Sequence, residues 1–137
     1  MNRFAELTKF IEVIEKDEIG EWIFDKKSKG TLDDPIQMPW FSYSPATLEF
    51  IQALYDFNDK NDHYDLYNYG DILEKNGIEW ADESMANADV SSLGDECVLA
   101  LIMGVIRADR FCEGALASFL KNGCIVKWLS RLKELDD

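Results

Sequence analysis

The chain has 137 residues, of which 47% are hydrophobic and 12% aromatic, and its formal net charge is −13. The length is typical of one domain, and the apolar content is too high for a disordered chain. The negative charge argues against binding to nucleic acid or to an anionic membrane, because both favour lysine and arginine. We therefore expect a single domain, residues 1–137, that binds neither of them directly.

The cysteines are Cys97, Cys112 and Cys124, and their spacing contains no CxxC pair. Cys97 adjoins an apolar run and Cys124 follows a glycine, which is typical of buried thiols in a reducing compartment. No signal peptide is visible, and the longest apolar run, residues 97–106, is too short to span a bilayer. These features predict a cytoplasmic protein, with no metal site and no cofactor.

The first half of the chain predicts two helices separated by a β element. Apolar residues recur at three- and four-residue steps over residues 2–16, which indicates an amphipathic helix. Two apolar runs within residues 21–41 favour a small β-hairpin or an extended segment. Ser44 as an N-cap, followed by Pro45 in the first turn, then predicts a helix over residues 45–58.

Two rows of apolar residues run along this second helix. Leu48, Ile51 and Tyr55 form one row, and Phe50, Leu54 and Phe57 lie beside it. A third helix is expected over residues 66–76. Gly77 would end it in a left-handed conformation, and Ile78 would fold back onto its last turn.

The second half predicts a buried central helix. Residues 79–90 are expected to form a loop or a short irregular segment, and Ser92 resembles an N-cap for a helix over about 92–110. Its middle is apolar on all sides, so neighbours should surround it. Gly104 lies within it and would cost about 1 kcal/mol relative to alanine unless another element packs closely there.

Two shorter helices, over residues 113–122 and 125–135, are expected to complete the chain. The predicted fold is mainly α. It is a single-domain bundle of five or six helices around the central helix at about 92–110, with the small β-hairpin or extended segment near residues 21–41.

The charge is concentrated in the middle of the chain. Residues 56–96 contain twelve acidic and two basic residues, a net charge of −10, whereas residues 97–137 are nearly neutral. Carboxylates interleaved with tyrosines suit a basic protein surface, because they pair with lysine and arginine while the rings supply contact area. A solvated acidic surface with core aromatics is the alternative. The candidate partner-binding residues are Asp56, Asp59, Asp62, Tyr64, Asp65, Tyr67, Asp71 and Glu74.

A second candidate cluster lies where the central helix ends and the next helix begins. It consists of Arg107, Asp109, Arg110, Cys112 and Glu113. Paired arginines and acids at a helix junction can cap helix ends and form ion pairs. The same residues could instead line a pocket, with Arg107 or Arg110 holding an anion. The cluster is therefore either structural or part of a ligand site.

Known catalytic and metal-binding patterns do not fit the sequence. An EF-hand loop counted from Asp65 places Gly70 correctly, but it puts Tyr67 and Tyr69 at ligand positions. His63 is the only histidine, and nearby carboxylates would favour its charged form. The sequence contains no Walker loop, GxGxxG, GxSxG or HExxH motif. These absences favour a protein that is not an enzyme.

The segment from Arg107 to Gly114, together with the helix start that follows it, resembles an uncharacterised family of small bacterial proteins, domain of unknown function number 6508. The resemblance extends through Gly123 and the Trp128–Leu132 ending. Asp109 and Glu113 stand where the family pattern has glutamate and aspartate, so the charge is kept. Further similar stretches are residues 19–23, 35–39, 69–73, 78–80 and 88–91.

This resemblance covers nearly the whole chain, but it brings no activity, cofactor or catalytic residue. It implies a bacterial source, and a mobile genetic element is one setting that it suggests.

Three functions remain open on the sequence. The first is a non-enzymatic module that binds a basic protein surface, one form of which is an anti-defence inhibitor that mimics nucleic acid. The second is a small enzyme or ligand-binding protein built on the cluster from Arg107 to Glu113. The third is an assembly subunit with Trp22, Trp40 or Trp80 at a homodimer contact. The sequence does not fix the oligomeric state.

Overall fold

The computed structural model describes residues 4–16, 20–23, 40–61, 64–109, 112 and 114–135. Within these residues the chain is mainly helical and has a two-stranded antiparallel hairpin, which confirms the predicted fold class. The elements are α1 (Ala5–Thr8), α2 (Phe10–Lys16), β1 (Gly20–Ile23), β2 (Trp40–Tyr43), α3 (Pro45–Lys60), η2 (Leu66–Asn68), α4 (Tyr69–Lys75), α5 (Asp82–Ala86), η3 (Val90–Ser92), α6 (Asp95–Ala108), α7 (Ala115–Lys121) and α8 (Cys124–Leu135).

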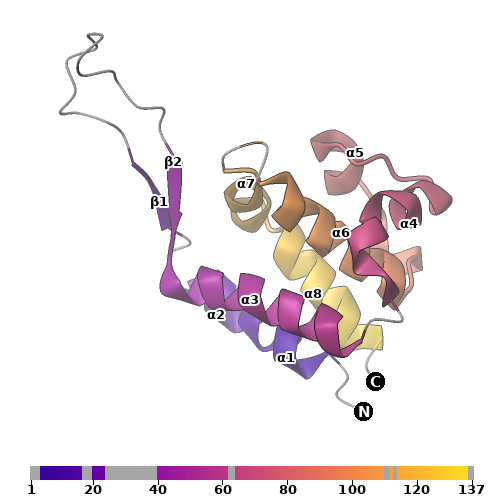
Figure 1. Cartoon of the computed structure of the whole chain (residues 1–137), viewed down its shortest axis with the longest axis horizontal. Helices are drawn as coiled ribbons and strands as arrows, with labels where there is room; N and C mark the ends of the chain where they lie inside the picture. The colour runs from indigo at the N-terminus through magenta and orange to yellow at the C-terminus, as the bar shows by residue number, and fades with distance from the viewer. Residues whose placement is uncertain are drawn as a thin grey trace, which may run out of the picture.

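Helix α6 is the central helix of the bundle. Every residue from Cys97 to Ile106 is buried, because α4, η2, α7 and α8 all pack against this helix (Figure 1). The helix begins later than expected. Ser92 does not cap it but belongs to η3, where the Asp89 carboxylate accepts a hydrogen bond from the Ser91 amide. The N-cap of α6 is Gly94, which has no side chain to form a capping hydrogen bond. Asp95 and Glu96 follow it in the first turn of the helix.

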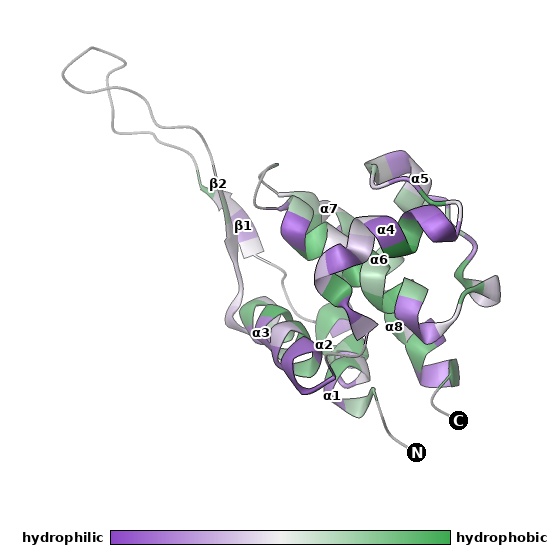
Figure 2. Ribbon diagram, turned by 45° about the vertical axis from the view of Figure 1, so that its right-hand side comes forward, coloured by the Kyte–Doolittle hydropathy of each residue, from purple (hydrophilic) through white to green (hydrophobic). Residues whose placement is uncertain are grey.

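Helices α1 and α2 pack against α8, and α3 packs against α1 and α2. The helix expected over residues 2–16 is interrupted at Lys9, and both pieces pack against α8 and α3. On α3, the row Phe50, Leu54 and Phe57 is buried, whereas Leu48 from the neighbouring row is 54% exposed. Figure 2 shows hydrophilic residues on the outer sides of α3 and α4. None of the described helices is long and apolar enough to cross a membrane.

The hairpin lies beside the start of α3 (Figure 1). Its register pairs Gly20 with Tyr43 and Ile23 with Trp40. The remainder of the predicted β region, residues 24–39, lies outside the described residues. Trp22 of β1 anchors the hairpin to the bundle, because a Cβ at Gly114 would lie 2.6 Å from Cζ2 of its ring. Only glycine allows this contact at the start of α7.

Residues 79–90 form more structure than the expected loop. They contain helix α5 and the start of η3, and Met85 of α5 is buried against the core. The Trp80 indole nitrogen donates a 3.0 Å hydrogen bond to the Gly104 carbonyl. A Cβ at Gly104 would lie 3.3 Å from Trp80 Cδ1 and 3.2 Å from Met85 Cε. The close neighbour that the glycine predicted is therefore this segment.

Helix α4 ends as the sequence predicts. Gly77 has a φ of +75° and Ile78 is buried. The Ile78 amide donates a 2.9 Å hydrogen bond to the Leu73 carbonyl, which satisfies a group left free at the helix end. This turn directs the chain toward Trp80, so the helix end helps to position the segment that packs on Gly104.

Candidate functional site

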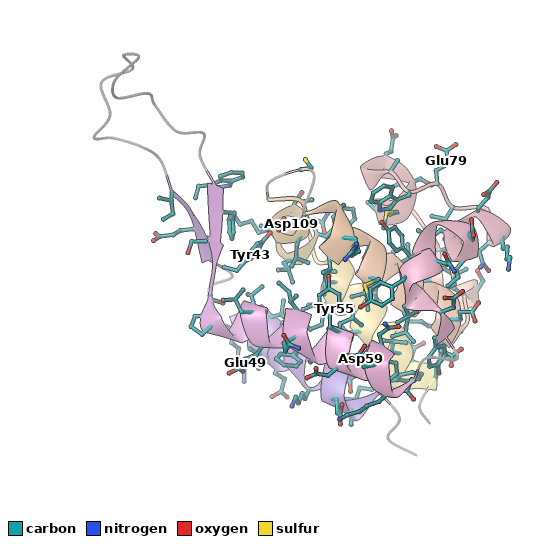
Figure 3. All side chains as sticks on the ribbon, in the orientation of Figure 1. Tyr43, Glu49, Tyr55, Asp59, Glu79 and Asp109 are labelled. Carbon is teal, nitrogen blue, oxygen red and sulfur yellow. The ribbon has the colours of Figure 1, made fainter. Side chains whose placement is uncertain are left out.

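The acidic residues of segment 56–96 are carried by the end of α3, by α4 and α5, by the start of α6 and by the connections between these helices. In Figure 1, α4 and α5 lie together on the side of the bundle away from the hairpin. Asp59 and Glu79 mark two positions within the acidic segment in Figure 3. We call the following exposed carboxylates the acidic face: Asp56, Asp59, Asp65, Asp71, Glu74, Glu79 and Glu83.

Basic residues from the chain ends leave most of these carboxylates unneutralised. The ion pairs between described residues join Lys60 to Glu6 and Arg131 to Glu134. Lys127 and Arg131 of α8 do reach the segment, but they donate to the backbone carbonyls of Ala88 and Leu93. Their charge therefore lies beside η3, away from the carboxylates of α4.

Two predicted acids have local partners. The Asp56 carboxylate accepts a hydrogen bond from Gln52, and the Asp65 carboxylate accepts one from Asn68. Asp65 has a φ of +54°, a conformation that aspartate and asparagine tolerate better than other residues with side chains. Asp62, which is also a predicted partner-binding residue, lies outside the described residues.

The two tyrosines predicted for partner binding have different surroundings. Tyr67 is 54% exposed, as a contact residue requires. Tyr64 is only 7% exposed, its ring stacks on Phe57 and its hydroxyl donates a 2.8 Å hydrogen bond to Asp95. Tyr64 therefore packs in the core, and a docking partner would not reach its ring.

Arg107 lies among tyrosines from three elements. Its guanidinium lies 5.8 Å from the centre of the Tyr67 ring, a cation–π arrangement. The pKa of Arg107 is raised, chiefly because the side chain of Tyr55 hydrogen-bonds the guanidinium, and Tyr69 adds to the effect. Arg107, at the end of α6, therefore interacts with tyrosines of α3, η2 and α4.

Asp109 has a structural role at the other side of the same helix end. Its Oδ1 atom accepts a 2.6 Å hydrogen bond from the Tyr43 hydroxyl and a 3.2 Å hydrogen bond from the Leu116 amide. The Tyr43 oxygen in turn accepts from the Ala117 amide. The carboxylate thus accepts a hydrogen bond from the N-terminal turn of α7, where the helix dipole favours a negative charge. Arg110 and Glu113, the other predicted members of the junction cluster, lie outside the described residues.

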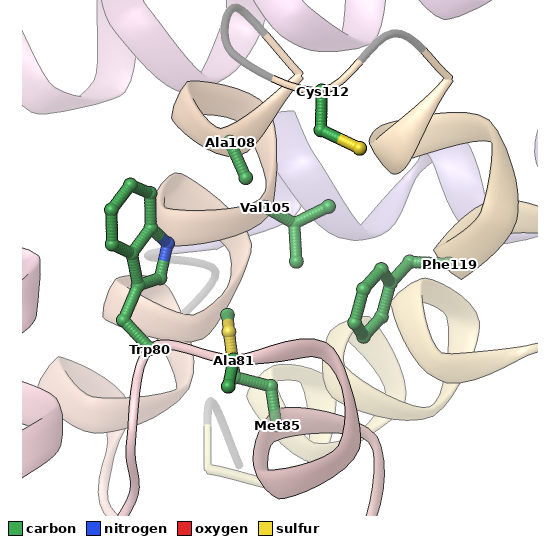
Figure 4. Close-up of a pocket in the computed structure, with 7 residues that line it drawn as sticks. All are labelled: Trp80, Ala81, Met85, Val105, Ala108, Cys112 and Phe119. Carbon is green, nitrogen blue, oxygen red and sulfur yellow. The ribbon is translucent and has the colours of Figure 1, made fainter.

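Cys112 is exposed, unlike Cys97 and Cys124, which are both buried as predicted. Burial raises the pKa of the Cys97 thiol to about 11, and burial also raises the pKa of Cys124. Cys112 borders a cavity of about 180 Å³, and the other described residues that line it are apolar. Figure 4 shows this cavity between Trp80 and Phe119, with Val105 and Ala108 of α6 between them.

The predicted junction cluster is therefore divided among three surroundings. Arg107 contacts tyrosines, Asp109 serves α7, and Cys112 borders the cavity, whose lining does not include Arg107 among the described residues. Within the described part of the chain, no three side chains of His, Cys, Asp or Glu lie close enough to hold a metal ion.

Trp80 was predicted as a homodimer contact, but it was not among the partner-binding residues predicted for the acidic segment. Its ring is 44% exposed, borders the cavity and packs edge-on against Tyr69 at 5.3 Å. The glycine at position 104 was the sequence signal that something packs closely on α6. Nothing local indicated that this neighbour would be an exposed tryptophan from 24 residues earlier.

Comparison with known proteins gives a family and no activity. Neither the curated proteins nor the solved structures contain one with significant similarity to this chain. A profile of a family of unknown function, DUF6508, matches residues 1–137. The match covers the whole chain and agrees with the resemblance carried by residues 107–132. The chain therefore belongs to the DUF6508 family.

Proposed function

We propose that the protein is a non-enzymatic interaction module whose acidic face binds a basic surface of another protein. The observation that carries this proposal is the exposure of Tyr67 and Trp80, 54% and 44%, within the same segment, residues 56–96, that carries the acidic face. Large aromatic side chains dominate binding energy at interfaces, and surrounding carboxylates steer a basic partner toward them.

The charge distribution supports the same proposal. Asp59, Asp71 and Glu74 are exposed, and the bases of α8 donate to backbone carbonyls. Because these carboxylates form no ion pair with another described residue, a partner that binds them does not have to break one. They also keep the negative potential over the face, which raises the rate of encounter with a basic surface.

One form of the proposal makes the basic partner surface a nucleic-acid groove. The protein would then act as an inhibitor that mimics phosphate charge, as an anti-defence protein of a mobile element would. Such an inhibitor competes directly with DNA or RNA for its target. Competition would be strongest at low salt, because both ligands depend on charge.

A ligand site built on the cluster from Arg107 to Glu113 is less well supported. Arg107 is held by tyrosines and Asp109 by Tyr43, so neither points its charge into the cavity. The cavity of about 180 Å³ is also smaller than the roughly 300–1,000 Å³ of typical small-molecule sites.

The test is affinity capture from the native host at low salt, followed by affinity measurement with each captured protein. The face variant changes Asp56, Asp59, Asp62 and Asp65 to asparagine. The control variant changes Glu12, Glu15, Glu21 and Glu49 to glutamine, which removes the same charge from exposed positions elsewhere. Since surface pairs contribute about 0.2–1 kcal/mol each, we expect the face variant to bind about tenfold more weakly. Equal affinities of the two variants, or no specific partner, would contradict the proposal.

A further inference from the structure

We propose that Trp80 is the shared wall of a two-part docking site that takes a peptide segment with an apolar side chain next to a basic one. This inference deepens the proposed function and rests on it. The apolar side chain would enter the cavity beside Cys112, and the lysine or arginine would lie on the opposite side of the indole. The partner is thus a basic protein with an exposed apolar anchor.

The apolar half is the cavity shown in Figure 4. Its walls come from three parts of the chain: Trp80 and Met85 before and within α5, Val105 and Ala108 of α6, and Phe119 of α7. A protein cavity of about 150 Å³ lined by apolar side chains accommodates benzene, so about 180 Å³ suffices for one leucine or phenylalanine side chain. Two residues of its lining, Trp80 and Cys112, are exposed to solvent.

The basic half is an open depression of about 460 Å³ that shares Trp80 with the cavity. Gly70, Gly77 and Ile78 form its floor and sides, and Glu74 and Glu79 supply two exposed carboxylates. A lysine or arginine here could pair with both carboxylates. It could also lie over the indole, where a cation–π contact contributes about 0.5–1 kcal/mol at an exposed site.

Trp80 is fixed in place before any partner arrives. Its nitrogen bonds to the Gly104 carbonyl at 3.0 Å, and its ring meets Tyr69 edge-on. A pre-arranged aromatic wall loses little side-chain entropy on binding, which favours affinity. The carboxylates of one half favour a cation, and the apolar lining of the other half favours an apolar side chain. A segment that fits both halves therefore carries one apolar side chain and one cation within a few residues of each other.

The probe is a blocked octapeptide in which phenylalanine is followed by two arginines. Two matched peptides replace the phenylalanine with serine, or the arginines with citrulline, which keeps their shape without the charge. Binding to the full-length protein is measured by calorimetry. Occupancy of the cavity is measured as protection of Cys112 from iodoacetamide, since Cys97 and Cys124 are buried.

We expect the phenylalanine–arginine peptide to bind and to slow alkylation of Cys112. The serine peptide should bind about thirtyfold more weakly, as for loss of a buried anchor, and the citrulline peptide about fivefold more weakly. Equal binding of the serine peptide would overturn the cavity half. Equal binding of the citrulline peptide would overturn the basic half, and absence of binding by all three would overturn the inference.

Two variants test the site from the protein side. Ala108→Phe fills the cavity from a half-buried position at the end of α6, and Ser118→Phe adds the same ring at an exposed position on α7. The pair E74Q and E79Q is compared with E12Q and E15Q. A108F and the E74Q/E79Q pair should weaken binding of the peptide, whereas S118F and the E12Q/E15Q pair should not. If the captured partner of the acidic face binds normally to A108F and to the E74Q/E79Q pair, this inference fails while the proposed function stands.

Discussion

The hydroxyl of Tyr43 donates a 2.6 Å hydrogen bond to the carboxylate of Asp109, 66 positions later in the chain. The same oxygen accepts from the Ala117 amide, and the carboxylate accepts from the Leu116 amide. These bonds join strand β2, the end of α6 and the start of α7. They position the α6–α7 connection, which carries Cys112 to the edge of the cavity.

Removal of this hydroxyl should destabilise the fold. Tyr43→Phe leaves the Ala117 amide and part of the Asp109 carboxylate without their partner, which we expect to lower the free energy of unfolding by about 1–3 kcal/mol. The measurement is chemical denaturation followed by circular dichroism. Tyr67→Phe is the matched control, because its ring is 54% exposed, and it should change stability by less than about 0.5 kcal/mol. Equal losses in the two variants would show that the contact to Asp109 contributes nothing.

Two glycines test the docking of the hairpin. Gly114 and Gly123 have φ values of +84° and +85°, so alanine is strained equally at both. Only at Gly114 would the new Cβ also meet the Trp22 ring, at 2.6 Å. We expect Gly123→Ala to cost about 1 kcal/mol and Gly114→Ala at least about 1 kcal/mol more. Thermal unfolding compares them, and similar melting temperatures would contradict the contact between β1 and α7.

A second pair of glycines tests the packing of Trp80 against α6. Both Gly70 and Gly104 lie within helices, where alanine is favoured by about 1 kcal/mol. A Cβ at Gly70 meets nothing within 4 Å, whereas one at Gly104 meets Trp80 and Met85 at 3.2–3.3 Å. Gly70→Ala should therefore raise the melting temperature, and Gly104→Ala should raise it less or lower it. A gain at Gly104 as large as that at Gly70 would mean that Trp80 does not pack there.

The buried Cys97 predicts a loss of stability at alkaline pH. Its pKa is about 11 in the folded chain, against an ordinary value of 9.0, because burial disfavours the thiolate. Above pH 9 the unfolded chain loses the Cys97 proton before the folded chain does. The contribution of Cys97 to the free energy of unfolding therefore falls by up to roughly 1.4 kcal/mol per pH unit until about pH 11.

The measurement is the free energy of unfolding between pH 8 and pH 11 for the wild type and Cys97→Ala. Other groups that titrate in this range are common to both proteins. The difference between the wild type and C97A should shrink as the pH rises. A constant offset for C97A would show that the thiol titrates alike in both states.

The features that could be predicted from the sequence are those set by neighbouring residues. An apolar run without a polar face, residues 97–106, identified the central helix, and Gly77–Ile78 identified the end of α4. Helix periodicity also predicted α3, but it could not choose between two adjacent apolar rows. Packing against α1 and α2 makes that choice, and it leaves Leu48 exposed.

The candidate site depended on contacts between distant residues, which a sequence pattern does not specify. The acids of segment 56–96 were visible in the sequence, but the burial of Tyr64 depends on Phe57 and Asp95. Arg107 and Asp109 are two residues apart and looked like one cluster. Because they lie on different sides of a helix end, Tyr67 holds one and Tyr43 the other.

The rate of association with the captured partner, measured at several salt concentrations, tests the acidic face most directly. The wild type and the variant with Glu12, Glu15, Glu21 and Glu49 changed to glutamine should both associate rapidly at low salt and slow steeply as salt rises. The variant with Asp56, Asp59, Asp62 and Asp65 changed to asparagine should associate slowly and with a shallower salt dependence. Three superimposable curves would contradict a docking role for this face.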